Sequence, residues 1–203
     1  MRFPRRTLAA TMALLVSWST TAALAAQPAG WQRLIDAAES QVGRTVYYDP
    51  AYTKLAYPGG DVPIERGVCS DVVIRAFRST GVDFQVLVHQ DMAAHFAAYP
   101  KRWSLKRPDR NIDHRRVLNL ATYLRRAGKA VATSGAAKEY LPGDIVSWDL
   151  VGNGSLPHIG IVSDRWVSGE QRRLIVHNIG AGTKVEDILF AYEITGHFRW
   201  IGR

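Results

Sequence analysis

The hydrophobic pattern of this chain changes its period near residue 128, and this change constrains the fold more than any other feature. Before it, apolar residues recur at the spacing of amphipathic helices, in the segments 30–44, 69–81, 83–100 and 114–128. After it, short β-branched and aromatic runs alternate with Gly, Asn, Ser and Pro, in 144–150, 158–164, 172–179 and 196–201. Short connections favour antiparallel pairing, so the pattern predicts an α+β fold in one domain.

The start of the chain has the composition of an export signal. Three arginines precede a short apolar stretch, and a small-residue cleavage site follows at 23–25. The stretch is too short for a membrane-spanning helix and has no stop-transfer flank. We therefore expect residues 1–25 to be removed, after Sec or twin-arginine export. Residues 26–203 would then form a single periplasmic or secreted domain without stable membrane insertion.

The charge balance of the chain is mildly basic. The whole sequence carries +8, and removal of the three arginines of the export signal leaves +5. Outside the cytoplasm, a positive charge of this size suits a polyanionic wall or membrane surface, or simply keeps the protein soluble. Nucleic acid is not expected as a partner in that compartment, and we expect the mature protein to be a monomer.

The chain contains a single cysteine, Cys69, in the stretch GVCSDVVIRAF. One cysteine cannot form an internal disulfide, and a free thiol in an oxidising compartment is either buried or used. Composition alone favours inert burial. The position points to use, because Cys69 lies in the first turn of an expected helix, where unpaired N–H groups and the helix dipole favour the thiolate. Asp71 works slightly against that ionisation.

Two histidines lie on expected neighbouring strands and are candidates to act on that thiol. His158 begins its strand, and Gly160 shares the same face and would let another group come close. If the strand carrying His177 pairs with it as a hairpin, the two side chains meet. A nucleophilic cysteine needs a base and a residue that orients the base. Taken singly, each histidine is typical of a structural polar residue. The remaining histidines are expected to be structural: His89, His95, His114 and His197.

Four stretches together resemble the NlpC-type papain-like cysteine peptidases of the bacterial cell wall. They are GVCSDVVIRAF, LPGDIVSW, PHIGIVSD and LIVHN. The runs YPGGDVPIERGVCSDVVIRAFR and NIDHRRVLNL resemble more closely a group of exported bacterial proteins catalogued as domain-of-unknown-function family 1287, within the same superfamily. The resemblance covers residues 30–203. It implies a single papain-like domain in which N-terminal helices, one of them carrying the nucleophile, pack on a C-terminal antiparallel sheet.

The resemblance also implies roles for individual residues. Cys69 matches the nucleophile, His158 the base, and His177 the residue that orients the base. No metal and no cofactor is implied. Tyr57, twelve residues before Cys69, matches a tyrosine near the oxyanion site of the peptidases, and a packing aromatic is the alternative explanation. Val68 departs from the peptidase pattern, which has an aspartate there.

Four charged residues are candidates for binding substrate. Asp71 stands where the peptidases have a glycine, and it could contact a substrate amine or a neighbouring arginine such as Arg75. Arginines near the cleft could bind the carboxylates of wall peptides as bidentate pairs. The arginines considered are Arg66, Arg115 and Arg116. Ordinary surface charge is the alternative explanation for each of them.

These features predict an exported cysteine amidohydrolase or peptidase that cleaves an amide bond in peptidoglycan, its expected partner. Three alternatives remain open. The thioester could pass to an amine or alcohol, which would make the protein a transferase. Cys69 could be inert in a protein that only binds wall fragments. Cys69, His158 and His177 could ligate zinc, although their spacing is not that of a recognised zinc motif.

Overall fold

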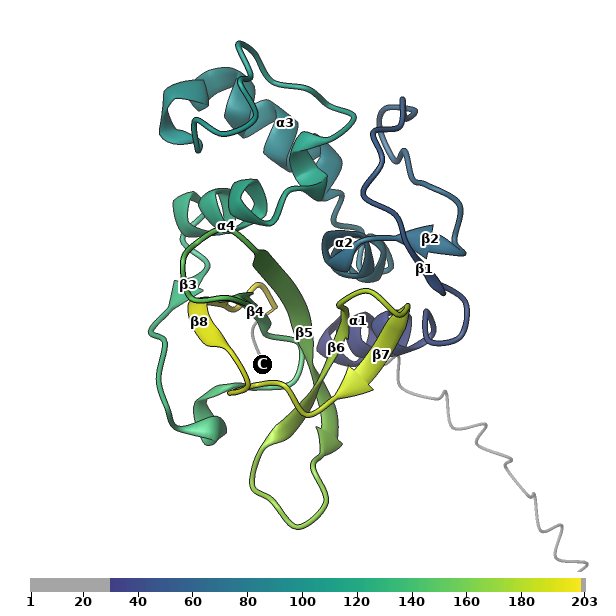
Figure 1. Cartoon of the computed structure of the whole chain (residues 1–203), viewed down its shortest axis with the longest axis vertical. Helices are drawn as coiled ribbons and strands as arrows, with labels where there is room; N and C mark the ends of the chain where they lie inside the picture. Colours follow the sequence, from purple (N-terminus) through teal and green to yellow (C-terminus); the bar gives the residue numbers. More distant parts are fainter. Residues whose placement is uncertain (1–29, 202–203) are drawn as a thin grey trace, which may run out of the picture.

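The helices of this protein precede its sheet, as the change of hydrophobic period predicts (Figure 1). The computed structural model describes residues 30–201, so the expected export signal at 1–25 lies outside the described residues. The α-helices within this range are α1 (Gly30–Glu39), α2 (Cys69–Arg78), α3 (Phe84–His95) and α4 (Val117–Arg126). Short 3₁₀ turns lie at Phe96–Ala98, Asp113–Arg115 and Ala137–Glu139. No described helix is long and apolar enough to cross a membrane.

An antiparallel sheet occupies the second half of the described chain (Figure 1). Its strands are β3 (Ala130–Val131), β4 (Ile145–Asp149), β5 (Pro157–Trp166), β6 (Arg173–Asn178), β7 (Thr183–Glu186) and β8 (Glu193–Phe198). Their order across the sheet is β3-β8-β4-β5-β6-β7. The four strands expected from the sequence correspond to β4, β5, β6 and β8, although the last was expected at 196–201 and spans Glu193–Phe198. The sequence pattern does not predict β3 and β7, which are short.

A two-residue parallel pair forms outside that sheet, in the segment between α1 and α2. β1 (Tyr47–Tyr48) pairs with β2 (Arg66–Gly67), and Tyr48 lies opposite Gly67. The chain between the two strands is irregular, and Leu55 and Val62 anchor it by being buried. This pairing places β1 beside the residues that directly precede α2.

Each face of the sheet has its own apolar core. The helix-covered core includes Ile145, Ile159, Ile161, Val176 and Phe198. The opposite core includes Val146, Trp148, Val162 and Ile175, which Tyr140 and Leu189 cover. Neighbouring residues of β4 and β5 thus point into different cores, as the two-residue period of a strand requires. α2 packs against β5 and β6, which sets the position of its first residue.

Residues on both sides of Cys69 explain why α2 begins there. Gly67 has φ 158°. A side chain at this position would crowd the first turn of the helix, because its Cβ would lie 3.1 Å from the carboxylate of Asp71. That carboxylate accepts the N–H of Val68 at 2.7 Å, and so satisfies a donor at the start of the helix. One stripe of the helix is fully buried and includes Val73 and Phe77. Burying a side chain such as Phe77 stabilises the fold by about 1.5–3 kcal/mol.

All four helices are shorter than their expected segments, and α1 and α4 differ in ways that change the placement of single residues. α1 ends at Glu39, so Val42, which continues the apolar spacing, is 46% exposed. α4 begins at Val117 because Arg116 has an extended backbone, which separates the helix from the 3₁₀ turn before it. The buried His114 therefore lies in that turn and not at the start of the helix.

Candidate active site

Cys69 lies where the first turn of α2 meets the start of β5. It is the first residue of the helix, and only 3% of its surface is exposed. The backbone N–H groups of Ile159 and Ser70 both donate to its sulfur. Ile159 directly follows His158, and Pro157 lines the same cleft as Cys69. The structure therefore brings the expected nucleophile to the strand that carries the expected base.

A series of side-chain contacts runs across β5, β6 and β7. His158 Nε2 lies 3.1 Å from His177 Nδ1, and His177 Nε2 lies 3.1 Å from Glu186 Oε2. The first contact confirms that the two histidines meet across a hairpin. Gly160 makes room for it, because a Cβ there would lie 2.7 Å from Ile175 Cγ2 and 3.1 Å from His177 Cβ. We call His158, His177 and Glu186 the histidine relay.

The carboxylate of Glu186 sets the tautomer of both rings. An ionised carboxylate only accepts hydrogen bonds, so Nε2 of His177 carries the proton and Nδ1 has the lone pair. His158 then donates from Nε2 to that lone pair, which leaves its own Nδ1 as an acceptor. The relay thus provides a proton acceptor on the ring nitrogen of His158 that does not face His177.

Burial keeps both rings of the relay neutral. Burial, with a smaller contribution from His177, lowers the pKa of His158 to about 3. Burial also lowers the pKa of His177, against the opposing effect of the Glu186 carboxylate. A neutral His158 at pH 7 can accept a proton, which is what a general base must do.

The thiol of Cys69 is protonated in the resting structure. Burial raises its pKa from 9.0 to about 11, and the charge of Asp71 adds to the rise. Hydrogen bonds from Ile159, Ser70 and Tyr48 lower the pKa, but by less than burial raises it. The thiolate expected at the helix start is therefore contradicted, because loss of solvent outweighs the favourable helix terminus. At rest the site therefore holds a neutral thiol at the start of α2 and a neutral imidazole on β5.

Tyr48, and not Tyr57, lies beside the thiol. The hydroxyl of Tyr48 hydrogen-bonds to Cys69, and burial, followed by the negative charge that Cys69 carries once it ionises, raises the pKa of Tyr48. Tyr57 packs elsewhere, with its ring 5.4 Å from the ring of His89 and 5.4 Å from the guanidinium of Arg110. The expected oxyanion tyrosine is corrected accordingly. The physical reason is the β1–β2 pairing, which brings Tyr48 next to α2 although it is more distant in sequence.

Asp71 and Arg115, both expected to contact substrate, bind one another instead. Nε and Nη2 of Arg115 donate to the two carboxylate oxygens of Asp71 at 2.8 and 2.9 Å. The side chains are only 2% and 4% exposed. Arg115 also donates to the carbonyl oxygens of Asp49 and Ala51, each at 3.2 Å. The pair thus ties α2 to the segment that directly follows Tyr48, and it positions the site from within the protein.

The two other expected substrate-binding arginines have different surroundings. Arg66 is exposed and pairs with Asp49 at 3.2 Å, away from the cleft of Cys69. Arg116 lines that cleft, with its guanidinium 4.2 Å from the ring centre of Trp103 and 3.1 Å from Asp113. Of the four charged candidates, Arg116 is therefore the one best placed to meet a bound molecule.

Cys69 lies in a cleft of about 350 Å³. The walls are mainly aromatic and aliphatic: Tyr48, Pro50, Tyr52, Val68, Trp103, Ile112, Val117 and Pro157. Tyr52 is 60% exposed and Trp103 is 44% exposed. A cleft with apolar walls and few polar groups is typical of a small-molecule or peptide site.

A metal centre is the remaining arrangement that the sequence leaves open. Across residues 30–201, no group of three His, Cys, Asp or Glu side chains could hold a metal ion. His158 and His177 face each other through ring nitrogens, as hydrogen-bond partners do. The geometry of these residues is that of acid–base chemistry.

Sequence reasoning did not find Tyr48 and Glu186. Tyr48 belongs to a segment with several tyrosines, and the sequence gives no reason to place one of them, rather than another, beside Cys69. Glu186 ends the short run TKVE, which follows a glycine-rich turn and alternates only once. The glycine-rich turn directly after the strand of His177 is the sequence feature that predicts a further strand, paired with that strand as a hairpin.

One family model and one curated relative match this chain. Residues 35–200 match the profile described as "Domain of unknown function (DUF1287)". The chain is 56% identical over 167 residues to "Uncharacterized protein YijF" of Escherichia coli (strain K12), an alignment that covers 82% of this chain and 80% of that protein. No solved structure matches the chain. The matched range includes Tyr48, Cys69 and the histidine relay.

Proposed function

The chain belongs to the DUF1287 family, and we propose that it is an exported cysteine amidohydrolase of papain-like architecture that cleaves an amide bond in peptidoglycan. One observation carries the proposal. A buried thiol lies next to the strand of a histidine whose tautomer is set by a second histidine and a carboxylate. This is the constellation of nucleophile, base and orienting groups that acyl transfer requires.

The first chemical step begins with both groups neutral. Proton transfer from Cys69 to His158 is uphill in the resting protein, so it accompanies attack of sulfur on the substrate carbonyl. The S–C bond forms, Nδ1 of His158 takes the thiol proton, and the carbonyl π electrons become an oxyanion. The Nε2–H bond to His177 and the charge of Glu186 stabilise the imidazolium that results.

The oxyanion and the leaving group are then handled by neighbouring donors. The hydroxyl of Tyr48, together with backbone N–H groups at the start of α2, can donate to the oxyanion. His158 returns its proton to the amine as the C–N bond breaks, which leaves a thioester on Cys69. Water, deprotonated by His158, attacks the thioester, and the acid and the thiol are released.

Two features of the sequence support peptidoglycan as the substrate. The stretches around Cys69, His158 and His177 resemble wall peptidases, and the first residues have the composition of an export signal. The aromatic cleft with Arg116 at its wall is compatible with a peptide that carries a carboxylate.

One observation favours a second candidate function, a wall-binding protein without catalysis. The raised pKa of Cys69 leaves very little thiolate at neutral pH, as in a structural cysteine. In that case the cleft would hold a wall fragment, and the relay would serve only to join β5, β6 and β7.

Digestion of purified peptidoglycan separates these functions. The mature protein, residues 26–203, is incubated with sacculi beside Cys69→Ala and His158→Gln variants, and the soluble products are analysed by liquid chromatography and mass spectrometry. We expect new fragments with the wild type only, and their masses identify the bond. Fragments that also appear with Cys69→Ala would overturn the mechanism. Binding to sacculi without any fragment would favour the non-catalytic function, and products joined to an added amine would indicate a transferase.

A further inference from the structure

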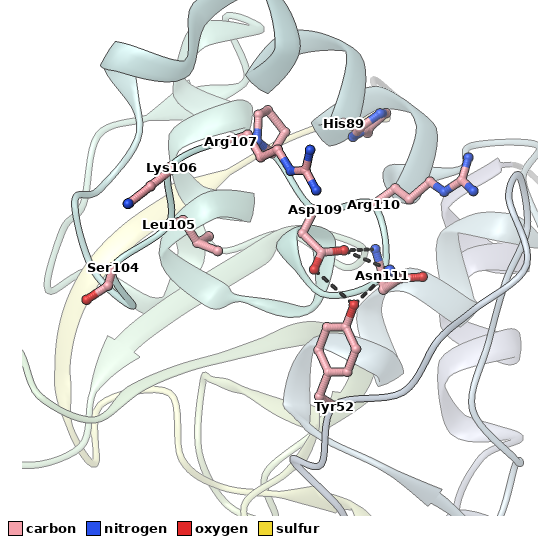
Figure 2. A pocket seen from close by; sticks show the side chains of 10 residues that line it. Tyr52, His89, Ser104, Leu105, Lys106, Arg107, Asp109, Arg110 and Asn111 are labelled. Carbon is pink, nitrogen blue, oxygen red and sulfur yellow. Dashed lines mark hydrogen bonds between the residues drawn. The ribbon is translucent and has the colours of Figure 1, made fainter.

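A second cavity, of about 600 Å³, adjoins the cleft of Cys69. Its walls come from Ser104–Asn111, from His89 on α3 and from Tyr52 (Figure 2). Tyr52 lines both spaces, so the ring forms a shared wall between them. A substrate lying along Tyr52 would occupy the cleft and the second cavity together.

The second cavity is rich in positive charge. Lys106, Arg107 and Arg110 line it, and none of them forms an ion pair with a carboxylate in the part of the chain that the structure describes. This differs from Arg115 below the cleft, whose guanidinium is fully engaged by internal acceptors. Cations that gather around a cavity without an internal counter-charge attract anions.

The one carboxylate of the cavity is occupied by its own loop. Asp109 accepts the hydroxyl of Tyr52 at 3.0 Å, and it accepts the backbone and side-chain N–H groups of Asn111 at 2.9 and 2.8 Å (Figure 2). Burial works against its ionisation, but these hydrogen bonds lower the pKa of Asp109 below its ordinary value. Its function is therefore to shape the loop and to hold Tyr52, and its hydrogen bonds occupy it with partners other than the three cations.

His89 lines the second cavity from α3. Its Nδ1 is buried and has no hydrogen-bond partner among residues 30–201. Because this atom is closed to solvent, a molecule in the cavity could reach it only if the imidazole ring turned, so the case for a bound anion depends on the three cations.

We propose that this cavity is a subsite for a carboxylate of the substrate peptide, whose scissile amide lies at Cys69. The inference rests on the proposed function, because it places one molecule across both spaces. The apolar and aromatic walls around Cys69 hold the body of the peptide, while the guanidinium groups of Arg107 and Arg110 hold its charged group. The protein is therefore selective for acidic peptides over their amidated forms.

Binding to a Cys69→Ala protein tests this without any turnover. The probe is an N-acetylated wall stem peptide, alanyl-γ-glutamyl-diaminopimelyl-alanine, used with free carboxylates and with all carboxylates amidated. Isothermal titration gives both affinities. We expect the free acid to bind about tenfold more tightly, since a hydrogen bond to a charged group contributes roughly that factor or more. The Arg107→Gln/Arg110→Gln double variant should lose that difference.

A matched control keeps the change of net charge but leaves the cavity intact. Arg33→Gln/Arg44→Gln removes two exposed cations elsewhere, and the preference for the free acid should remain. Equal affinity for the two peptides in the parent protein would overturn the subsite, as would an equal loss in both double variants. Displacement by inorganic phosphate, with no effect of peptide amidation, would identify a site for free anions and also overturn it. Circular dichroism verifies that each variant is folded.

Hydrolysis measured in parallel separates this inference from the proposed function. If the wild type prefers the free acid and cleaves nothing, the subsite stands and the hydrolase proposal fails. If it cleaves free and amidated peptides equally well, and the arginine substitutions have no effect, the hydrolase stands and the subsite fails.

Discussion

Two histidine–carboxylate pairs lie on the same sheet, and their surroundings differ in an instructive way. His177 meets Glu186 at 3.1 Å on β6 and β7, while His197 of β8 meets Asp144 at 2.7 Å. Both rings are buried, at 0% and 2% exposure. By composition and distance alone, the second pair is the more convincing candidate for a catalytic dyad.

The pair around His197 is closed on every side. Nδ1 of the ring lies 3.2 Å from the carbonyl oxygen of Ala132, and Nε2 faces Asp144. Arg199 donates to both oxygens of Asp144 at 2.8 and 2.7 Å, and the ring stacks on Tyr140 at 4.3 Å. Every polar atom of this histidine is used, so the cluster joins β8 to the segments beside it and can pass no proton to a ligand.

The pair around His177 is open at one end. His177 accepts a hydrogen bond from His158, and the remaining nitrogen of His158 is free of the relay. That nitrogen belongs to a residue between Pro157, which lines the cleft, and Ile159, which contacts the thiol. A histidine–carboxylate pair is therefore a candidate for catalysis only when a ring nitrogen close to a nucleophile stays free to accept a proton.

Substitution of His158, which adjoins the open pair, and of His197, which belongs to the closed pair, gives the largest contrast. His158→Gln removes the base, so kcat/KM for wall-peptide hydrolysis should fall by about 10³-fold with little change in the thermal midpoint. His197→Gln should lower the midpoint but leave the activity per folded molecule intact. Product formation by mass spectrometry and thermal scans by circular dichroism measure both. Equal losses of activity in the two variants would remove the distinction.

Asp144→Asn should expose the structural role of the closed pair. The substitution leaves the charge of Arg199 without its buried counter-ion, and we expect the free energy of unfolding to fall by about 3 kcal/mol. Urea denaturation measures this, with the slope expected to stay constant. Asp36→Asn on the exposed face of α1 is the matched control and should have almost no effect. A fall of unfolding free energy as small as that of the control would contradict the assignment.

Alkylation of Cys69 tests the resting state of the open site. A pKa of about 11 in place of 9.0 means about a hundredfold less thiolate at pH 7, so iodoacetamide should react correspondingly slowly. Because the folded protein keeps the thiol protonated to higher pH, the rate should continue to rise between pH 8 and 10, where an ordinary thiol levels off. Tyr48→Phe removes a hydrogen bond that lowers the thiol pKa, so it should slow alkylation further. A plateau below pH 9 would disprove the raised pKa.

Glu186→Gln should have the smallest effect of the series. Glutamine can still accept the N–H of His177 through its amide oxygen, so the tautomer is kept while the charge is lost. We expect about a tenfold fall in kcat/KM, typical of a residue that orients a ligating or catalytic histidine. The Glu186 carboxylate raises the pKa of His177, so its loss should move the acidic limb of the pH–rate profile to lower pH. Glu193→Gln on β8 is the control, and an unchanged profile would exclude Glu186 from the relay.

Much of this arrangement follows from local rules in the sequence. The helical spacing of Val72, Val73, Ala76 and Phe77 predicts α2 and places Cys69 at its start. Alternation in the strands of His158 and His177 predicts two neighbouring strands, and Gly160 indicates where a side chain comes close. These features depend on residues within a few positions of one another, so a single sequence can specify them.

The sequence by itself determined the α+β order, the helix that begins at Cys69, and the two strands that carry His158 and His177, while their pairing remained a condition that the structure meets. Only the tertiary structure decided that Tyr48 lies beside the thiol, that Glu186 completes the relay, and that the thiol stays protonated. The reason is that pairing of β1 with β2 and exclusion of solvent from Cys69 depend on segments far apart in the chain. A pKa reflects everything that surrounds the group, and no local pattern of residues contains that information.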